Sequence, residues 1–171
     1  MTVRLSLKTT LCLMSVLAAT GCSVMDKLIS DPVAPQEKAQ KTMELQGKGT
    51  QLFQCVRDAK GLYWKFVSPQ AELVNANGVL IVRQGADFSF FAKDGSMLAA
   101  KITRWDESND RNNLRDVLFT TQSRGKKGTL TGVRFVQRLD GKGGMPLTRC
   151  SPSQLGSSLS VPFTARYVFF K

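Results

Sequence analysis

The chain has 171 residues, of which 42% are hydrophobic and 22% are charged, and this balance fits one globular domain rather than a disordered chain. It is basic, with 24 Lys and Arg against 13 Asp and Glu, and it contains no His. The missing His excludes the Ser–His–Asp triad, the Cys–His catalytic pair and every His-ligated metal site.

The first 22 residues have the layout of a bacterial export signal. Arg4 and Lys8 give a positive start without acids, and the largely apolar run LCLMSVLAA follows from Leu11. A helix that spans a bilayer needs about 20 residues, so this run is too short to remain in the membrane and favours a secretory signal. The small residues at 18–21 lead directly to Cys22.

This ending resembles the lipobox of bacterial lipoproteins, in which the cysteine is acylated and becomes the new N-terminus. Ala19 departs from the Leu that the lipobox prefers, and a plain cleaved signal is the alternative. Several acyl chains, at about 0.8 kcal/mol per buried methylene, would hold the protein on a membrane. Ser23 in place of Asp favours the outer membrane by resemblance to the enterobacterial sorting rule. We therefore expect a signal peptide over 1–21 and an outer-membrane lipoprotein that faces the periplasm or the cell surface.

Two cysteines remain after Cys12 leaves with the signal and Cys22 takes the lipid. They are Cys55 and Cys150, and outside the cytoplasm two leftover thiols usually pair. The sequence therefore predicts a Cys55–Cys150 disulfide, with two separate buried thiols as the alternative. Signal cleavage removes two basic residues and no acid, which lowers the formal net charge from +11 to +9.

Residues 22–48 have the composition of a tether. They contain DPVAPQEKAQK, with two prolines, alternating charges and few large apolar residues. We expect this segment to lift the domain off the membrane, with a short helix near Glu37–Leu45.

From Gly49 onward, short runs alternate apolar and polar residues between turn formers, which is typical of strands. The predicted strands are Thr50–Val56, Leu62–Val67, Ala71–Val74, Val79–Val82, Asp87–Ala92, Met97–Trp105, Thr129–Leu139 and Val161–Phe170. A ninth segment, Leu114–Thr121, fits a strand or a short helix. Long helical periods are missing, so we predict an all-β domain over 49–171 with eight or nine short antiparallel strands, either a β-sandwich or a small barrel.

An ordered set of short motifs runs from Gly49 to Phe170. Its residues are Gly49, Gln51, Phe53, Cys55, Trp64, Pro69, Ala71, Leu73, Asp94, Gly95, Ser96, Gln137, Arg138, Gly143, Gly144, Pro146, Cys150, Pro162, Phe163, Thr164, Ala165, Tyr167 and Phe169. The set resembles a family of secreted bacterial and fungal proteins known as domain of unknown function 3455. The resemblance implies a secreted, disulfide-linked β domain and no particular activity. The chain departs from the family before Asp94, where VRQGADFSFFAK lacks the usual His and Gly-Pro and has Phe88 in place of Trp.

No motif predicts a catalytic residue, a cofactor or a metal site. Asp94-Gly95-Ser96 lacks the pattern of a nucleophile elbow and fits a hairpin turn. Gly141-Lys142-Gly143-Gly144 matches no phosphate-binding fingerprint and fits a permissive loop. The acidic stretch 106–110 lacks the Gly and distal Glu of a calcium loop and fits a solvated loop.

Basic residues cluster in the last third of the chain. Arg124, Lys126 and Lys127, together with Arg134 and Arg138, are candidates for a cationic surface that binds lipid headgroups or the phosphates of an anionic glycolipid. A solvated hairpin tip is the alternative, and no nucleic-acid motif is present.

The sequence therefore favours a non-enzymatic binding or structural module of the cell envelope. Its expected partners are the membrane, through the N-terminal lipid, and an envelope protein or an anionic glycolipid. A His-free, carboxylate-based glycan hydrolase and a cell-surface assembly factor are the alternatives. The hydrolase would need two acids across one cleft, and no pair among the 13 acids stands out in the sequence.

Overall fold

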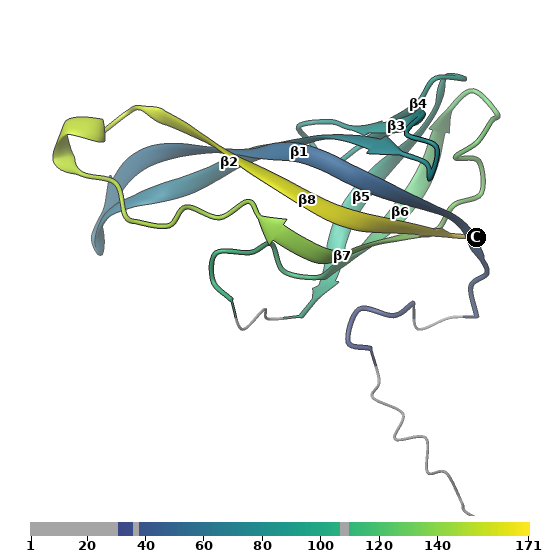
Figure 1. Ribbon diagram of the computed structural model, residues 1–171, viewed down its shortest axis with the longest axis horizontal. Coiled ribbons are helices and arrows are strands. Elements are labelled where there is room, and N and C mark those ends of the chain that lie inside the picture. Colours follow the sequence, from purple (N-terminus) through teal and green to yellow (C-terminus); the bar gives the residue numbers. More distant parts are fainter. Residues whose placement is uncertain (1–30, 36–37, 107–109) are drawn as a thin grey trace, which may run out of the picture.

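The computed structural model describes residues 31–35, 38–106 and 110–171. Figure 1 gives the arrangement of the strands along the chain. The predicted signal peptide and the predicted lipidation site Cys22 lie outside the described residues.

Eight antiparallel strands form one sheet that closes on itself. They are β1 (Lys41–Asp58), β2 (Gly61–Val74), β3 (Leu80–Gln84), β4 (Phe90–Ala92), β5 (Ser96–Trp105), β6 (Val117–Gly125), β7 (Phe135–Gly143) and β8 (Ser158–Phe170). Each strand pairs with the next in the chain, and β8 pairs with β1 to close a barrel. The all-β, single-domain prediction is confirmed, and of the two architectures left open the sheet adopts the barrel.

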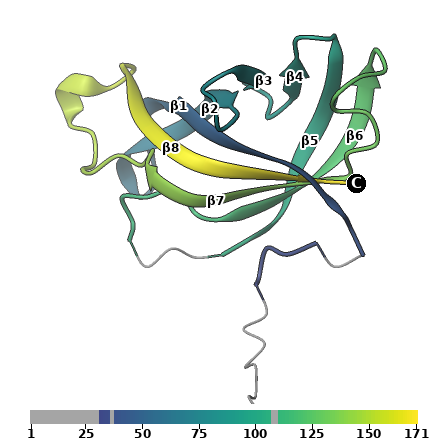
Figure 2. The ribbon, with the colours of Figure 1, turned by 45° about the vertical axis from the view of Figure 1, so that its right-hand side comes forward.

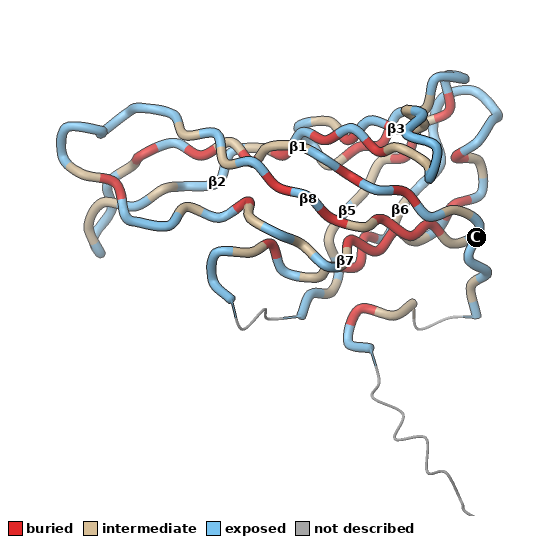
Figure 3. Tube along the Cα trace, viewed as in Figure 1, coloured by how far each residue is buried: buried red, intermediate tan, exposed pale blue. Residues whose placement is uncertain are grey.

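The core fills the barrel interior because alternate side chains of each strand point inward. On β8, Phe163, Ala165, Tyr167 and Phe169 are buried, as the alternation in the sequence predicts. The ring of Phe90 lies at the centre and contacts the rings of Phe119, Tyr167 and Phe169 at centroid distances of 5.7, 6.2 and 5.7 Å. Figure 3 shows the buried positions along the inner side of the barrel strands. Burial of each such side chain contributes about 1.5–3 kcal/mol to stability.

The barrel begins earlier than the boundary at 49 that the sequence suggested. Strand β1 starts at Lys41, and its pairing with β8 extends from Lys41 to Gln54. Leu45 is buried in the core, which a solvated tether would not allow. The helix expected near Glu37–Leu45 is therefore wrong from Lys41 onward, since pairing with β8 satisfies the backbone there.

Other strand boundaries also differ from expectation. The strand expected from Asp87 starts only at Phe90, because the Gly85 amide bonds to the Ser89 carbonyl in a turn. The two strands expected over Leu62–Val67 and Ala71–Val74 are one continuous strand, β2. The strand expected from Thr129 starts only at Phe135, because Thr131 and Val133 bond back to Gly128 and Leu130 in tight turns. The ambiguous segment at 114–121 is a strand from Val117.

Three strands are longer than the barrel wall and project from it as an arm, which we define as Leu52–Asp58, Gly61–Phe66 and Ser158–Ser160. β3 pairs with β2 only over Ala71–Val74, and β7 pairs with β8 only as far as Phe163, so neither neighbour covers the arm. Figure 1 shows the arm to the left of the barrel, with the connection 144–157 beside it. That connection contains a single 3-10 turn, Pro152–Gln154.

The predicted disulfide joins the arm to this connection. The sulfur atoms of Cys55 and Cys150 are 2.04 Å apart and the Cα atoms 5.9 Å apart. Backbone bonds lie beside it, from the Cys55 amide to the Ser157 carbonyl at 2.9 Å and from the Gly156 amide to the Cys55 carbonyl at 3.0 Å. The connection is therefore held against the arm by both covalent and hydrogen bonds. Among the described residues, the structure has no helix with the length and hydropathy needed to cross a membrane.

Removal of the disulfide is expected to destabilise the barrel. The bond closes a loop with a sequence separation of 95 residues. Replacement of both cysteines, Cys55→Ala with Cys150→Ala, should lower the free energy of unfolding by about 2–5 kcal/mol in urea titrations. The exposed variant Leu155→Ala in the same connection is the control and should change it by less than about 0.5 kcal/mol. An unchanged midpoint in the double variant would contradict a stabilising role.

Candidate functional site

The connections between strands divide into two groups at opposite ends of the barrel. The arm-side end carries the connections 85–89 and 144–157, together with Asp106 and residues 110–116. The terminal end carries the connections 75–79, 93–95 and 126–134, together with the start of β1 and the C-terminus. Figure 2 shows the C-terminus at the end of β8 away from the arm.

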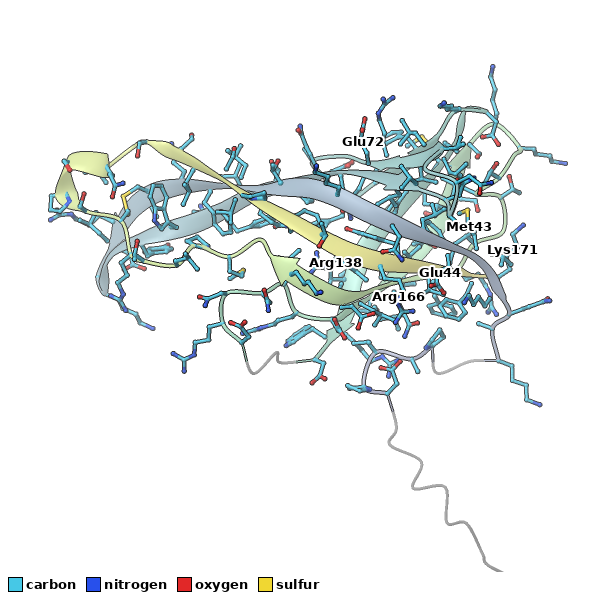
Figure 4. All side chains as sticks on the ribbon, viewed as in Figure 1. Met43, Glu44, Glu72, Arg138, Arg166 and Lys171 are labelled. Carbon is cyan, nitrogen blue, oxygen red and sulfur yellow. A yellow bond between two sulfur atoms is a disulfide. The ribbon has the colours of Figure 1, made fainter. Side chains whose placement is uncertain are left out.

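A buried arginine lies in the barrel wall toward the arm-side end. Arg138 follows Val136 at the inward-facing spacing of β7 and is only 5% exposed. The register places it between Val117 of β6 and Tyr167 of β8, both of which face the core. Figure 4 shows Arg138 between the arm and Lys171, which lies at the terminal end.

The surroundings of Arg138 satisfy little of its hydrogen-bonding capacity. Its Nη2 donates to the Arg115 carbonyl at 3.1 Å, and its Nε–H has no partner. Burial lowers the pKa of Arg138, while the Tyr167 hydroxyl and the Asp116 carboxylate partly oppose that shift. Burial also raises the pKa of Tyr167 to about 12, and its hydroxyl donates to Gln84 Oε1 at 3.0 Å. The barrel interior thus holds a polar chain of Arg138, Tyr167 and Gln84.

The glycine-rich end of β7 lets the preceding connection lie close to it. The Leu114 amide donates to the Gly143 carbonyl at 2.9 Å, and the Gly143 amide donates to Asn113 Oδ1 at 2.7 Å. A Cβ atom on Gly141 would be 2.6 Å from the Leu114 carbonyl oxygen, which only glycine avoids. The glycine-rich segment that was expected to be a permissive loop therefore packs closely against residues 110–115 and positions them.

A cleft of about 620 Å³ opens between these segments. Its lining residues are Asp110, Arg111, Asn113, Leu114, Arg115, Arg138 and Met145. Three arginines and one aspartate make the described part of the lining cationic. Its volume falls in the range of about 300–1,000 Å³ that is typical of small-molecule sites.

A second cleft adjoins the first and extends toward the arm. It has a volume of about 390 Å³ and shares Arg111 with its neighbour. Trp64 of the arm and Leu147 of the 144–157 connection supply its apolar surface, and Arg149 adds a further cation. We call the two together the arm-side cleft. The arrangement places cationic and apolar side chains next to each other, which suits binding of a ligand with both characters.

Comparison with known proteins assigns the family. The family described as "Protein of unknown function (DUF3455)" matches residues 35–171. The chain belongs to the DUF3455 family. The family resemblance seen in the motifs is thereby confirmed, while no curated protein and no solved structure matches the chain.

In this DUF3455 chain, three aspartates gather next to the arm-side cleft. Asp106, Asp116 and Asp140 line a cavity of about 220 Å³ with Leu114 and Gly141. Burial raises the pKa of Asp116, and the charges of Asp140 and Asp106 raise it further. Asp140 forms an ion pair with Arg166 at 2.8 Å. Within the described ranges, no set of three or more His, Cys, Asp or Glu residues has the geometry of a metal site.

The family motif Asp94-Gly95-Ser96 is a hairpin turn, as the sequence predicts. Gly95 has a φ of 83°, and the Asp94 carboxylate accepts bonds from the Ser96 amide at 2.9 Å and hydroxyl at 2.5 Å. It also accepts bonds from the Thr129 amide and hydroxyl at 2.6 and 2.7 Å. Ser96 is buried, and its Oγ accepts a bond from the Leu130 amide at 3.1 Å. The turn therefore ties two loops of the terminal end together and offers no accessible nucleophile.

The five basic residues proposed as one cationic surface do not all lie together. Arg124, Lys126, Lys127 and Arg134 are exposed and lie at the terminal end. The prediction that Arg138 belongs to this exposed surface is wrong. The alternation along β7 turns its side chain into the barrel and not toward solvent. The exposed four thus lie at the terminal end, whereas Arg138 lies inside the barrel wall and lines the arm-side cleft.

Sequence analysis missed Arg111 and Arg115, which line the arm-side cleft, and gave Trp64 no specific role. Nothing in a loop sequence marks Arg111 or Arg115, because only the tertiary structure brings them to β7. The sequence did contain a pattern that marks Arg138 as unusual. This charged residue comes two positions after Val136 and so interrupts the apolar face of a strand.

The stability contributed by Asp94 is expected to depend on pH. Hydrogen bonds to its carboxylate lower the pKa of Asp94 below its ordinary value of 3.8, led by that from the Ser96 hydroxyl. A lowered folded-state pKa gives stability that is present above about pH 4 and is lost as the pH falls through the folded value. The urea midpoint of Asp94→Asn should therefore lie below that of the wild type at about pH 6, and the difference should shrink toward about pH 2.

The matched control for this titration is Asp58→Asn at the exposed tip of the arm. Its carboxylate accepts a bond from the Lys60 amide, at 2.7 Å, and does not join two loops. A difference between wild type and Asp94→Asn that stays constant across the pH range would contradict the role assigned to the Asp94 charge.

Proposed function

We propose that this protein is a lipid-anchored, non-enzymatic binding module of the outer membrane, which holds its ligand in the arm-side cleft. The observation that carries the proposal is the cleft of about 620 Å³ whose wall contains the buried Arg138. A site of this size with a few convergent polar groups is the usual form of a small-molecule site.

The start of β1 lies at the terminal end, which supports membrane attachment on that side. Eight residues separate Cys22 from Asp31, and this stretch spans at most about 30 Å. Val33 is buried, and its carbonyl and the Asp31 carboxylate both accept bonds from Gln137 on the outside of β7. The anchor would therefore be held close to the barrel.

The exposed basic residues of the terminal end suit an anionic membrane surface. Arg124, Lys126 and Lys127 lie in or beside the loop that joins β6 to β7, and Arg134 donates to the Lys38 carbonyl at 3.3 Å. Each basic residue near such a surface adds about 1 kcal/mol of attraction. This orientation would turn the arm-side cleft away from the lipid and toward soluble or cell-wall ligands.

The residue types of the chain favour binding over catalysis. The chain has no His to act as a base, and Ser96 is buried within its turn. One observation favours the hydrolase alternative, namely the raised pKa of Asp116 in a cavity that it shares with Asp106 and Asp140. That cavity, at about 220 Å³, is smaller than the usual ligand site, and Arg166 already pairs with Asp140.

The anchor is tested by Cys22→Ser in the full chain expressed in a Gram-negative host. The wild type should enter the detergent phase of membrane extracts, and its mature mass should include the acyl chains. The variant should lose the acyl mass and leave the membrane fraction after a high-salt wash, since salt screens the remaining basic contacts. Lys60→Ala at the arm tip is the control and should stay in the membrane fraction. A variant that remains in the detergent phase would overturn lipid anchoring.

Binding and hydrolysis are distinguished by native mass spectrometry together with a turnover assay. The membrane-extracted protein should carry one intact small molecule at unit stoichiometry and should not turn over fluorogenic glycosides. Glycoside turnover that Asp116→Asn abolishes, with the fold retained by circular dichroism, would replace the binding proposal with a carboxylate-based hydrolase. Asp58→Asn, at the exposed tip of the arm, is the control for that assay.

A further inference from the structure

We propose that the arm-side cleft takes a ligand with an oxyanion head group, a carboxylate or a phosphate, on an apolar body, and that Arg138 binds the head. The inference rests on the proposed binding function and names the chemistry of the ligand.

Arg138 is buried without an ion pair. The residue is 5% exposed, and none of the ion pairs among the described residues includes it. Removing an ion from water costs several kcal/mol unless a counter-charge and hydrogen bonds replace the water. The Arg115 carbonyl accepts a bond from Arg138, and the Tyr167 hydroxyl and the Asp116 carboxylate also act on it, but no carboxylate forms an ion pair with it and its Nε–H has no partner. An anionic ligand would supply a direct counter-charge and an acceptor.

The charge of the cleft around Arg138 also favours an anion. Arg111 and Arg115 add two exposed guanidinium groups to the lining. Asp110 is the one acid among the lining residues that the structure describes. Three arginines against this aspartate give the described lining an excess of positive charge, which attracts anions and repels cations.

The geometry of the donor favours an oxyanion. A guanidinium presents N–H donors in a planar fork that matches the two oxygens of a carboxylate or a phosphate. The bond from Nη2 to the Arg115 carbonyl orients this fork, and the Nε–H is left without a partner in the protein. An oxyanion is thus the ligand group that uses the donors that Arg138 has left.

The volume of the cleft and the rest of its lining indicate that the ligand has an apolar body. The cleft of about 620 Å³ is larger than a bare oxyanion needs, and Leu114 and Met145 form part of its wall. The adjoining cleft of about 390 Å³ continues past Arg111 to Trp64 and Leu147. A ligand that places its head on Arg138 has apolar side chains within reach of its body.

The test uses inorganic phosphate, phenyl phosphate and benzoate as probes of the full-length mature protein. Binding is followed through the Nε–Hε signal of Arg138 in ¹H–¹⁵N spectra and through tryptophan fluorescence. We expect the Arg138 signal to shift with phenyl phosphate and benzoate. We expect phenyl phosphate to bind at least about tenfold more tightly than inorganic phosphate, because only the former has a body that contacts apolar side chains. A stronger response to phenyl phosphate than to benzoate assigns a phosphate head, and the reverse assigns a carboxylate head.

Two substitutions separate binding from folding. Arg138→Met should weaken phenyl phosphate or benzoate binding at least about tenfold and should raise the melting temperature without ligand, because it removes an unpaired buried charge. Arg111→Gln, at an exposed position in the lining, should weaken binding with the melting temperature unchanged, and it tests the site if Arg138→Met does not fold. Arg124→Met at the terminal end is the matched control and should change neither quantity.

The inference is overturned if no probe binds the wild type, or if Arg111→Gln and a folded Arg138→Met bind as the wild type does. A neutral or cationic molecule found at unit stoichiometry by native mass spectrometry would also overturn it while leaving the binding function intact. A protein that carries no molecule and binds no probe would contradict both proposals.

Discussion

The pairing of β1 with β8 is the constraint on which the rest of the structure depends. It extends over 13 residue pairs and closes the sheet, so the barrel has an inside and an outside. Within the barrel wall, closure removes the free edges of the sheet and makes the side-chain alternation of each strand decide burial. It also brings the start of β1 and the end of β8 together at the terminal end, which leaves the arm-side end open for the cleft.

The interior that closure creates is not uniformly apolar. Phe90 and its aromatic neighbours fill the centre, but Arg138, Tyr167 and Gln84 form a polar chain in the same interior. A Cβ atom on Gly47 would lie 2.5 Å from the Tyr167 ring, so glycine at that position makes room for the tyrosine. A buried cation without a counter-ion reduces stability, and natural proteins accept such a cost mainly at functional sites. Stability of the fold therefore favours an uncharged residue at position 138, whereas the proposed binding site needs an arginine there.

The arm links the disulfide to the cleft. β1, β2 and β8 continue beyond the wall, and Cys55–Cys150 ties the 144–157 connection to them. Met145 and Leu147, which line the two parts of the cleft, lie in that connection. A bond that stabilises the fold thus also limits the movement of one side of the cleft. The glycines at 141, 143 and 144 have the corresponding role on the other side, where residues 110–115 pack against β7.

The sequence by itself determined the fold class, the disulfide and the family, because alternation, turn residues and cysteine number are local or countable features. The inward face of Phe163, Ala165, Tyr167 and Phe169 was readable for the same reason. The start of the barrel at Lys41 could not be predicted from the sequence, since pairing with a strand more than 100 residues away overrides local propensity. Only the tertiary structure separated Arg138 from the exposed basic residues and brought Arg111, Arg115 and Trp64 to the arm-side cleft. Strand register and loop packing decide such proximity, and both arise from contacts between distant segments of the chain.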